Sequence, residues 1–175
     1  MTPFSRPFVL ALVVCVLCAP ALSWAGQEKA PQKILVFDFD LIDYADTLNA
    51  GPDEAHKKRL RLVADVLRQE LEGSPRFEVV DIDLARDMLE EMGTPPNCSG
   101  CELEIAQELG ADLVGIGVVS RTSSLILDIS FYILDAMTGK TMWIKVVGIR
   151  GDTDNTYSRG IKYMVRNYLL NKDKK

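Results

Sequence analysis

Histidine is almost absent from this 175-residue chain, which contains His56 alone, and the motifs of several enzyme classes are missing. A zinc site usually takes four protein ligands, so a single histidine argues against zinc. The phosphate-binding loops G-x-G-x-x-G and the Walker sequence do not occur, and neither does a Ser-His-Asp set. The sequence therefore offers no standard zinc, nucleotide or serine-hydrolase chemistry, and we expect no cofactor.

Long apolar runs are equally scarce, since the chain has one, at residues 8–18. This run follows Arg6 and is too short to span a bilayer as a stable helix. Ser23-Trp24-Ala25 comes next and is typical of a small-x-small cleavage site. We therefore expect residues 1–25 to be a cleavable export signal. The mature protein would be periplasmic or secreted, without stable membrane insertion.

Only two cysteines remain after this cleavage, Cys98 and Cys101, and neither signal cysteine follows the small residues that lipid attachment needs. In an oxidising compartment such a C-x-x-C pair most often forms a disulfide. A thiol–disulfide factor is the alternative, because a helix N-terminus lowers the pKa of a thiol. Glu102 and Glu104 lie where they disfavour a thiolate, so we favour a structural disulfide.

Basic side chains are fewer than acidic ones. The chain has 20 basic and 25 acidic side chains, and loss of Arg6 with the signal leaves 19 against 25, a net charge of −6. Nucleic acid requires a basic face, so we exclude it as a partner. One compact basic patch stands out, made of Lys57, Lys58, Arg59 and Arg61. It is a candidate surface for an acidic partner, or else an ordinary exposed helix face.

The mature chain divides into a polar leader at 26–32, one domain at 33–171 and a disordered tail at 172–175. Apolar periodicity predicts strands at 33–39, 77–80, 112–120, 125–133 and 142–150, with helices at 53–72, 81–92, 101–109 and after 154. Right-handed crossovers make the first three strands parallel, and a meander adds two antiparallel ones. The prediction is an α/β (α+β-like) fold with a single five-stranded mixed sheet, in the order β-α-β-α-α-β-β-β-α.

Three finer expectations accompany this fold. Asp40 to Pro52 is predicted to be a loop, and Leu125 is expected to share the buried face of the fourth strand. Tyr168 is expected on the inner stripe of the last helix. Gly115 and Gly117 lie on one face of their strand, where they would let a helix approach the sheet closely.

The first strand ends in Phe37-Asp38-Phe39-Asp40-Leu41, at the usual ligand-binding end of a parallel strand. The spacing resembles the D-x-D-G-T motif of the haloacid-dehalogenase phosphatases. That resemblance implies Asp38 as nucleophile and Asp40 as acid/base around magnesium. Leu41-Ile42 replaces the Gly-Thr of the tight turn, so we favour a strand that ends in solvated aspartates. A small phosphatase-like hydrolase remains the alternative.

Carboxylates also cluster in a way that a hard cation such as calcium could use. The candidates are Asp38, Asp40, Asp43 and Asp46 in one segment, and Asp152 and Asp154 in another. No EF-hand spacing is present, and clustered aspartate in loops is ordinarily turn chemistry. We therefore expect no metal site, with these residues as the alternative.

Several short motifs occur together along the chain. They are Cys98-Ser99-Gly100-Cys101-Glu102, Ile105-Ala106-x-x-Leu109-Gly110-Ala111-Asp112, Asp135-x-x-Thr138-Gly139 and Arg150-Gly151-Asp152-Thr153-Asp154. With the segment from Ile34 to Asp40, they resemble a family of secreted bacterial proteins of unknown function over nearly the whole mature chain. A sub-pattern is also similar to the N-terminal domain of TolB and to CsgG- and LpoB-like envelope proteins.

This resemblance implies a five-stranded α/β module that binds other proteins and performs no catalysis. We therefore expect a non-enzymatic periplasmic accessory or protein-interaction domain. Its partner would be another envelope protein.

Overall fold

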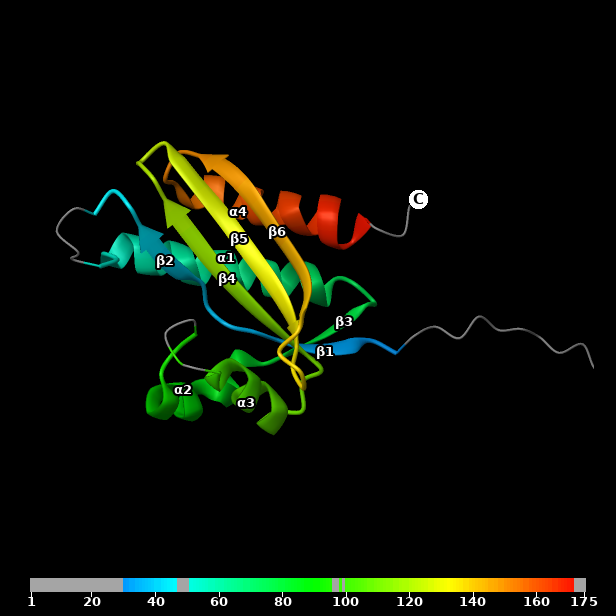
Figure 1. Cartoon of the computed structure of the whole chain (residues 1–175). Helices are drawn as coiled ribbons and strands as arrows, with labels where there is room; N and C mark the ends of the chain where they lie inside the picture. Colours follow the sequence, from blue (N-terminus) through cyan, green and yellow to red (C-terminus); the bar gives the residue numbers. More distant parts are fainter. Residues whose placement is uncertain (1–29, 47–50, 96–97, 99, 172–175) are drawn as a thin grey trace, which may run out of the picture.

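A computed structural model of the chain describes residues 30–46, 51–95, 98 and 100–171. The predicted export signal and C-terminal tail lie outside the described residues. One sheet forms the centre of the domain, in the order β3-β1-β4-β5-β6, and β2 also pairs with β4 (Figure 1). The strands are β1 (Gln32–Val36), β2 (Asp40–Asp43), β3 (Phe77–Val80), β4 (Leu113–Arg121), β5 (Ile126–Asp135) and β6 (Thr141–Arg150).

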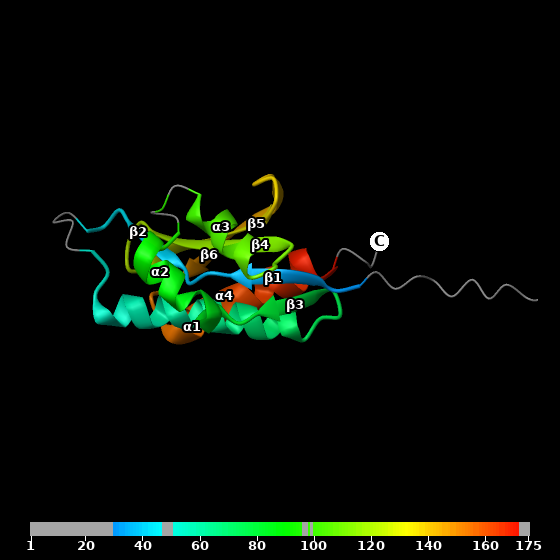
Figure 2. The same cartoon turned by 90° about the horizontal axis from the view of Figure 1, so that it is seen from below.

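The helices lie on both faces of this sheet. They are α1 (Glu54–Glu72), α2 (Arg86–Met92), α3 (Cys101–Glu108) and α4 (Asp154–Met164), with a 3₁₀ turn at Ile82–Ala85 and a π-helical turn at Val165–Leu169. Figure 2 shows α1 and α4 on one side of the sheet and α2 and α3 on the other. Among the described residues, none of the helices is long and apolar enough to cross a membrane.

The pairing of the strands confirms the predicted α/β class and mixed sheet. β1 pairs in parallel with β3 and β4, and β4, β5 and β6 form an antiparallel meander. The sheet has one short strand more than expected, because β2 pairs in parallel with β4 where the sequence predicted a loop. β2 is only four residues long and lies among aspartates, a composition typical of turns, which is why the pattern did not reveal it.

The larger core lies between the sheet and the helices α1 and α4. Asp53 caps α1, since its carboxylate accepts a hydrogen bond from the N–H of His56 at 2.8 Å. The apolar stripe predicted for this helix is buried, and it comprises Leu60, Val63, Leu67 and Leu71. A smaller core lies under α2 and α3 and includes Leu35, Phe37, Ile105 and Val114.

Two of the finer predictions about side-chain direction are wrong. Leu125 precedes β5 and is exposed, because the turn before the strand ends the alternation that buries Leu127 and Ile129. Tyr168 is 36% exposed, because the last turn of the C-terminal helix is π-helical. The N–H of Leu170 donates to the carbonyl of Val165, and this wider turn rotates Tyr168 away from the core.

The predicted role of Gly115 and Gly117 is also wrong. A Cβ atom at Gly117 would lie 2.3 Å from the ring of Phe39, and one at Gly115 would lie 2.9 Å from the ring of Phe131. The two glycines therefore make room for aromatic rings packed on the sheet. They do not make room for a helix.

Candidate functional site

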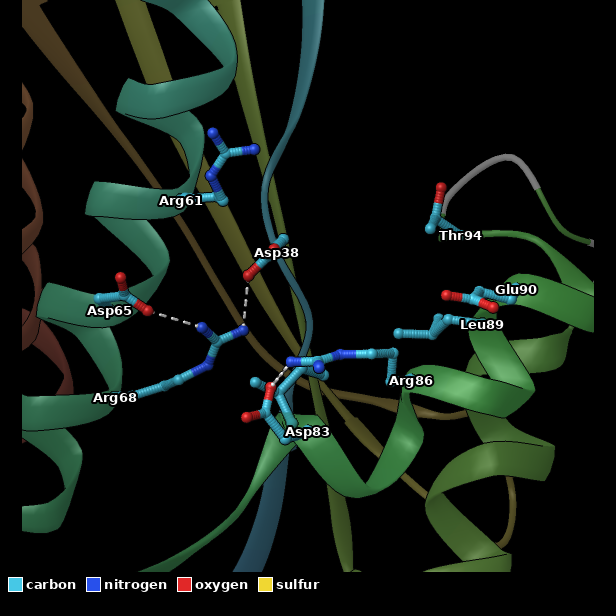
Figure 3. A pocket seen from close by; sticks show the side chains of 10 residues that line it. Asp38, Arg61, Asp65, Arg68, Asp83, Arg86, Leu89, Glu90 and Thr94 are labelled. Carbon is cyan, nitrogen blue, oxygen red and sulfur yellow. Dashed lines mark hydrogen bonds and ion pairs between the residues drawn. The ribbon is translucent and has the colours of Figure 1, made fainter.

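A cleft of about 400 Å³ lies beside the carboxyl end of β1, between α1 and the segment that contains α2 (Figure 3). It contains Asp38, the residue proposed above as a possible nucleophile. Its charged lining residues are Asp38, Arg61, Asp65, Arg68, Asp83, Arg86 and Glu90. Four of these residues are acidic and three are basic, so the cleft presents no single strong charge to a ligand.

Asp38 lies at a β-bulge. Val36 pairs with Gly115 and Asp40 pairs with Val118, so four steps along β1 and β2 match three steps along β4. The extra residue interrupts the alternation that would place both aspartates on one side of a strand. The structure therefore does not present Asp38 and Asp40 as the D-x-D pair of a phosphatase.

Arg68, a residue that the sequence analysis did not single out, organises this end of the sheet. Its guanidinium donates to the carbonyl of Val36 from Nε at 3.1 Å and from Nη2 at 2.8 Å. It also contacts the carboxylates of Asp38 at 2.7 Å and Asp65 at 3.0 Å. The side chain is 11% exposed. Arg68 thus satisfies the carbonyl just beyond the last residue of β1 that pairs with β3, and it holds Asp38 in an ion pair.

A second group of charged residues lies where β2 and β4 end, near the start of α1 and the turn between β6 and α4. Asp152 contacts His56 Nε2 at 3.0 Å and Arg59 Nη1 at 3.1 Å, and its side chain is 14% exposed. Arg121, at the end of β4, contacts Asp43 at 2.7 Å and Asp152 at 3.7 Å. This ionic cluster, defined by Asp43, His56, Arg59, Arg121 and Asp152, connects β2, α1, β4 and the β6–α4 turn.

The charges and burial of the ionic cluster shift the pKa values of two side chains, Asp43 within the cluster and Tyr157 beside it. Burial by itself raises the pKa of Asp43, but hydrogen bonds from Arg121 and from the N–H of Ala45 bring this pKa below its ordinary value. Burial, followed by the negative charge of Asp152, raises the pKa of Tyr157 well above its ordinary value. Tyr157 therefore stays neutral and packs as part of the core.

The ionic cluster also divides the predicted basic patch. Arg59 is turned toward Asp152 and Asp154 and is only 20% exposed. Lys58 lies 3.9 Å from Asp154, and Lys57 pairs with Glu54 at 2.8 Å. Arg61 lies in the cleft instead. Lys58 and Arg59 thus share the carboxylate of Asp154, whereas Lys57 and Arg61 have other neighbours.

The predicted cation ligands do not converge. Among the described residues, the one group of three or more possible metal ligands that lie close together is Cys98, Cys101 and Glu102. The cysteines are paired at the start of α3, with Cα atoms 5.6 Å apart. The carboxylate of Glu102 lies 3.7 Å from Sγ of Cys98, where its charge disfavours a thiolate. A structural disulfide remains the prediction for this pair.

A third surface carries apolar side chains instead of charges. Met142, Ile144 and Val146 of β6 are 58%, 53% and 49% exposed. Trp143 and Val147 of the same strand pack against the larger core, so Ile144 and Val146 lie on the face of the sheet opposite α1 and α4, with Met142 at the register shift beside them. Figure 1 shows β6 beyond the part of the sheet that α2 and α3 cover. We call these three residues with their neighbour Tyr132 the open sheet face. Sequence alternation placed Met142 to Arg150 in a strand but not at an uncovered edge.

Comparison with known proteins identifies the fold and the family. The LpoB C-terminal domain from Salmonella enterica is similar, with a TM-score of 0.51 and 17% identity over 71% of this chain and 87% of that one. Lipoprotein GNA1162 from Neisseria meningitidis is similar with a TM-score of 0.52 and 16% identity, over 79% of this chain and 99% of that one. These two likenesses show the fold that the sequence motifs predicted.

TolB from Acinetobacter baumannii aligns at a TM-score of 0.43 and 13% identity, over 79% of this chain and 29% of TolB. No curated protein sequence matches the chain. A family described as Protein of unknown function (DUF2380) matches residues 32–169, which confirms the predicted membership in a family of unknown function. The chain belongs to this family.

Proposed function

We propose that this protein is a non-enzymatic accessory domain of the bacterial envelope that binds another protein through the open sheet face. The observation that carries the proposal is the row of Met142, Ile144 and Val146, each about half exposed on one strand. Contiguous apolar side chains on a surface typically mark an interaction site. The predicted export signal and the family resemblance support a periplasmic location.

The enzymatic alternatives have weaker support. Arg68 engages the carboxylate of Asp38, and the bulge separates Asp38 from the alternation that contains Asp40. For the thiol–disulfide alternative, Glu102 lies beside Cys98 and works against the thiolate that such a factor needs.

Photo-crosslinking in living cells tests the proposed function. A photoreactive amino acid replaces Ile144 in the full-length chain, and the matched control carries it at Gln69, on the exposed side of α1. We expect one discrete adduct from position 144 and none from position 69. Equal labelling from both positions, or no adduct from position 144, would contradict the proposal.

A hydrolase assay addresses the main alternative. The purified mature protein and its Asp38→Asn variant are incubated with p-nitrophenyl phosphate and magnesium. We expect no turnover above background for either protein. A magnesium-dependent activity that disappears in Asp38→Asn would replace the binding function with a phosphatase.

A further inference from the structure

β6 is the last strand of the sheet, and among the described residues no strand pairs with its outer edge. The hydrogen bonds of the meander show which backbone groups face that edge. The N–H of Gly151 donates to Leu125 at 3.2 Å, and the N–H of Thr122 donates to Ile126 at 3.0 Å. With the observed register, the odd-numbered residues of β6 therefore bond to β5. The N–H and C=O groups of Ile144, Val146, Gly148 and Arg150 consequently point outward.

Between Ile144 and Arg150 this edge lacks three of the devices that usually block pairing with another strand, namely proline, bulges and a short strand. From Ile144 to Arg150 the pairing with β5 is regular and no proline occurs. Lys145 points to the helix side, where its Nζ lies 3.7 Å from the ring of Tyr168. A shallow groove of about 430 Å³ lies between residues 141–145, at the start of β6, and Tyr168.

The charge along the edge indicates what it can pair with. Residues 140–150 contain Lys140, Lys145 and Arg150 and no acidic residue, although the whole chain has a net charge of −5. Of these, Lys145 and Arg150 lie in the stretch that is open to pairing, so a second copy paired through the same strand would bring these two cations against the same two of its partner. An acidic segment would instead be attracted by both side chains.

We propose that β6 binds an extended, acidic segment of a partner protein by strand addition. The segment pairs with the outward backbone groups from Ile144 to Arg150, and its apolar side chains cover Ile144 and Val146. This inference rests on the proposed function and specifies the chemistry of the partner. It assigns the specificity to the positive charge of β6 and the affinity to its backbone.

A model peptide provides the probe. The fluorescently labelled heptapeptide Glu-Val-Glu-Val-Glu-Val-Glu is titrated with the mature protein, and binding is followed by anisotropy. The lysine counterpart of the peptide is the charge control. We expect the acidic peptide to bind at least about tenfold more tightly than the lysine peptide, and to slow the hydrogen exchange of the Val146 and Gly148 amides.

Val146→Pro removes one outward N–H without removing a bond to β5, so it tests the backbone mode directly. Val146→Thr is the matched control that keeps this N–H. We expect about tenfold weaker binding for Val146→Pro and unchanged binding for Val146→Thr. Arg150→Glu provides a second variant, independent of the backbone, that should weaken binding of the acidic peptide. Circular dichroism verifies that each variant is folded.

Several results would overturn the inference. Equal binding of the two peptides would contradict the role of charge, and full binding by folded Val146→Pro would contradict pairing through the backbone. A dimer in sedimentation velocity that Val146→Pro abolishes would assign the edge to a second copy.

The cellular crosslink separates the two proposals. An adduct from position 144 that persists with Val146→Pro preserves the proposed function and removes strand addition, whereas a missing adduct in the parent removes the proposed function itself.

Discussion

Two stretches of backbone at the lateral edges of the sheet are treated in opposite ways. Where β1 extends beyond β3, Arg68 binds the free carbonyl of Val36 and the bulge at Asp38 breaks the run of backbone groups. On β6, four residues direct their backbone groups outward with no such cover among the described residues. The protein therefore protects the edge of β1 beyond β3 with its own side chain and leaves the edge of β6 available for binding.

Removing Arg68 should give the largest effect on this comparison. Arg68→Met leaves the carbonyl of Val36 and the carboxylate of Asp38 without their partner, so we expect a loss of about 3 kcal/mol in the free energy of unfolding. Urea denaturation measures this loss. Arg61→Met, in the same cleft and more exposed, is the control and should change stability by less than about 0.5 kcal/mol. Equal losses for the two variants would show that Arg68 does not protect the edge.

Filling the space at Gly117 should come next. In Gly117→Ala the new Cβ meets the ring of Phe39, which follows the bulge and stacks 6.2 Å from Phe131. We expect a loss of about 2 kcal/mol, measured by thermal and urea denaturation. Gly148→Ala on the exposed β6 is the matched control and should cost less than about 1 kcal/mol. A neutral Gly117→Ala variant would mean that the packing of Phe39 is loose.

Acid should weaken the ionic cluster next to the protected edge. The pKa of Asp43 is lowered in the folded protein, so its ion pair stabilises the fold above the ordinary value of 3.8 and loses this effect as the pH falls below it. Asp43→Asn should therefore be less stable than the parent at pH 7, and the difference should shrink between about pH 4 and pH 2. A difference that stays constant over this range would contradict an ionised Asp43 as its origin.

The smallest effect should come from the open sheet face. Val146 is half exposed, so Val146→Thr should change the free energy of unfolding by less than about 0.5 kcal/mol. Val147 of the same strand packs against the larger core, and Val147→Thr should cost about 1 kcal/mol or more. Urea denaturation of the two variants measures the contrast. A costly Val146→Thr would indicate that part of the chain already covers this face.

The sequence predicted the architecture well because apolar alternation and helix periodicity are local signals. These signals predicted the apolar stripe from Leu60 to Leu71, the helix cap at Asp53 and the parallel pairing of β1 with β3 and β4. Arg68 was not, because its partner Val36 lies 32 residues away and only the packing of α1 on β1 brings the two together. The bulge at Asp38 also depends on pairing with β4, which no short motif encodes.

The open edge illustrates the same limit. Alternation identified β6 as a strand with one packed face, but its position at the end of the sheet is a property of topology. The ion pairs of Arg59 in the predicted basic patch illustrate the same limit. Arg59 lies in a run of basic residues, yet its guanidinium pairs with Asp152 and Asp154, which are more than ninety residues away in sequence. A local sequence pattern could not predict these pairs.

The ionic cluster has a consequence for the folding kinetics of the domain. His56 and Asp152 are 96 residues apart in sequence, and Arg121 and Asp43 are 78 residues apart. Asp43 and Arg121 are register partners in the pairing of β2 with β4, so their contact forms together with the sheet. The contact of His56 with Asp152 also requires the turn after β6, so we expect it to form after the transition state for folding. Interactions absent from the transition state mainly slow unfolding. The contacts of Asp152 would therefore determine how long the native domain persists once it has formed, while the rate of folding depends on the sheet and on α1.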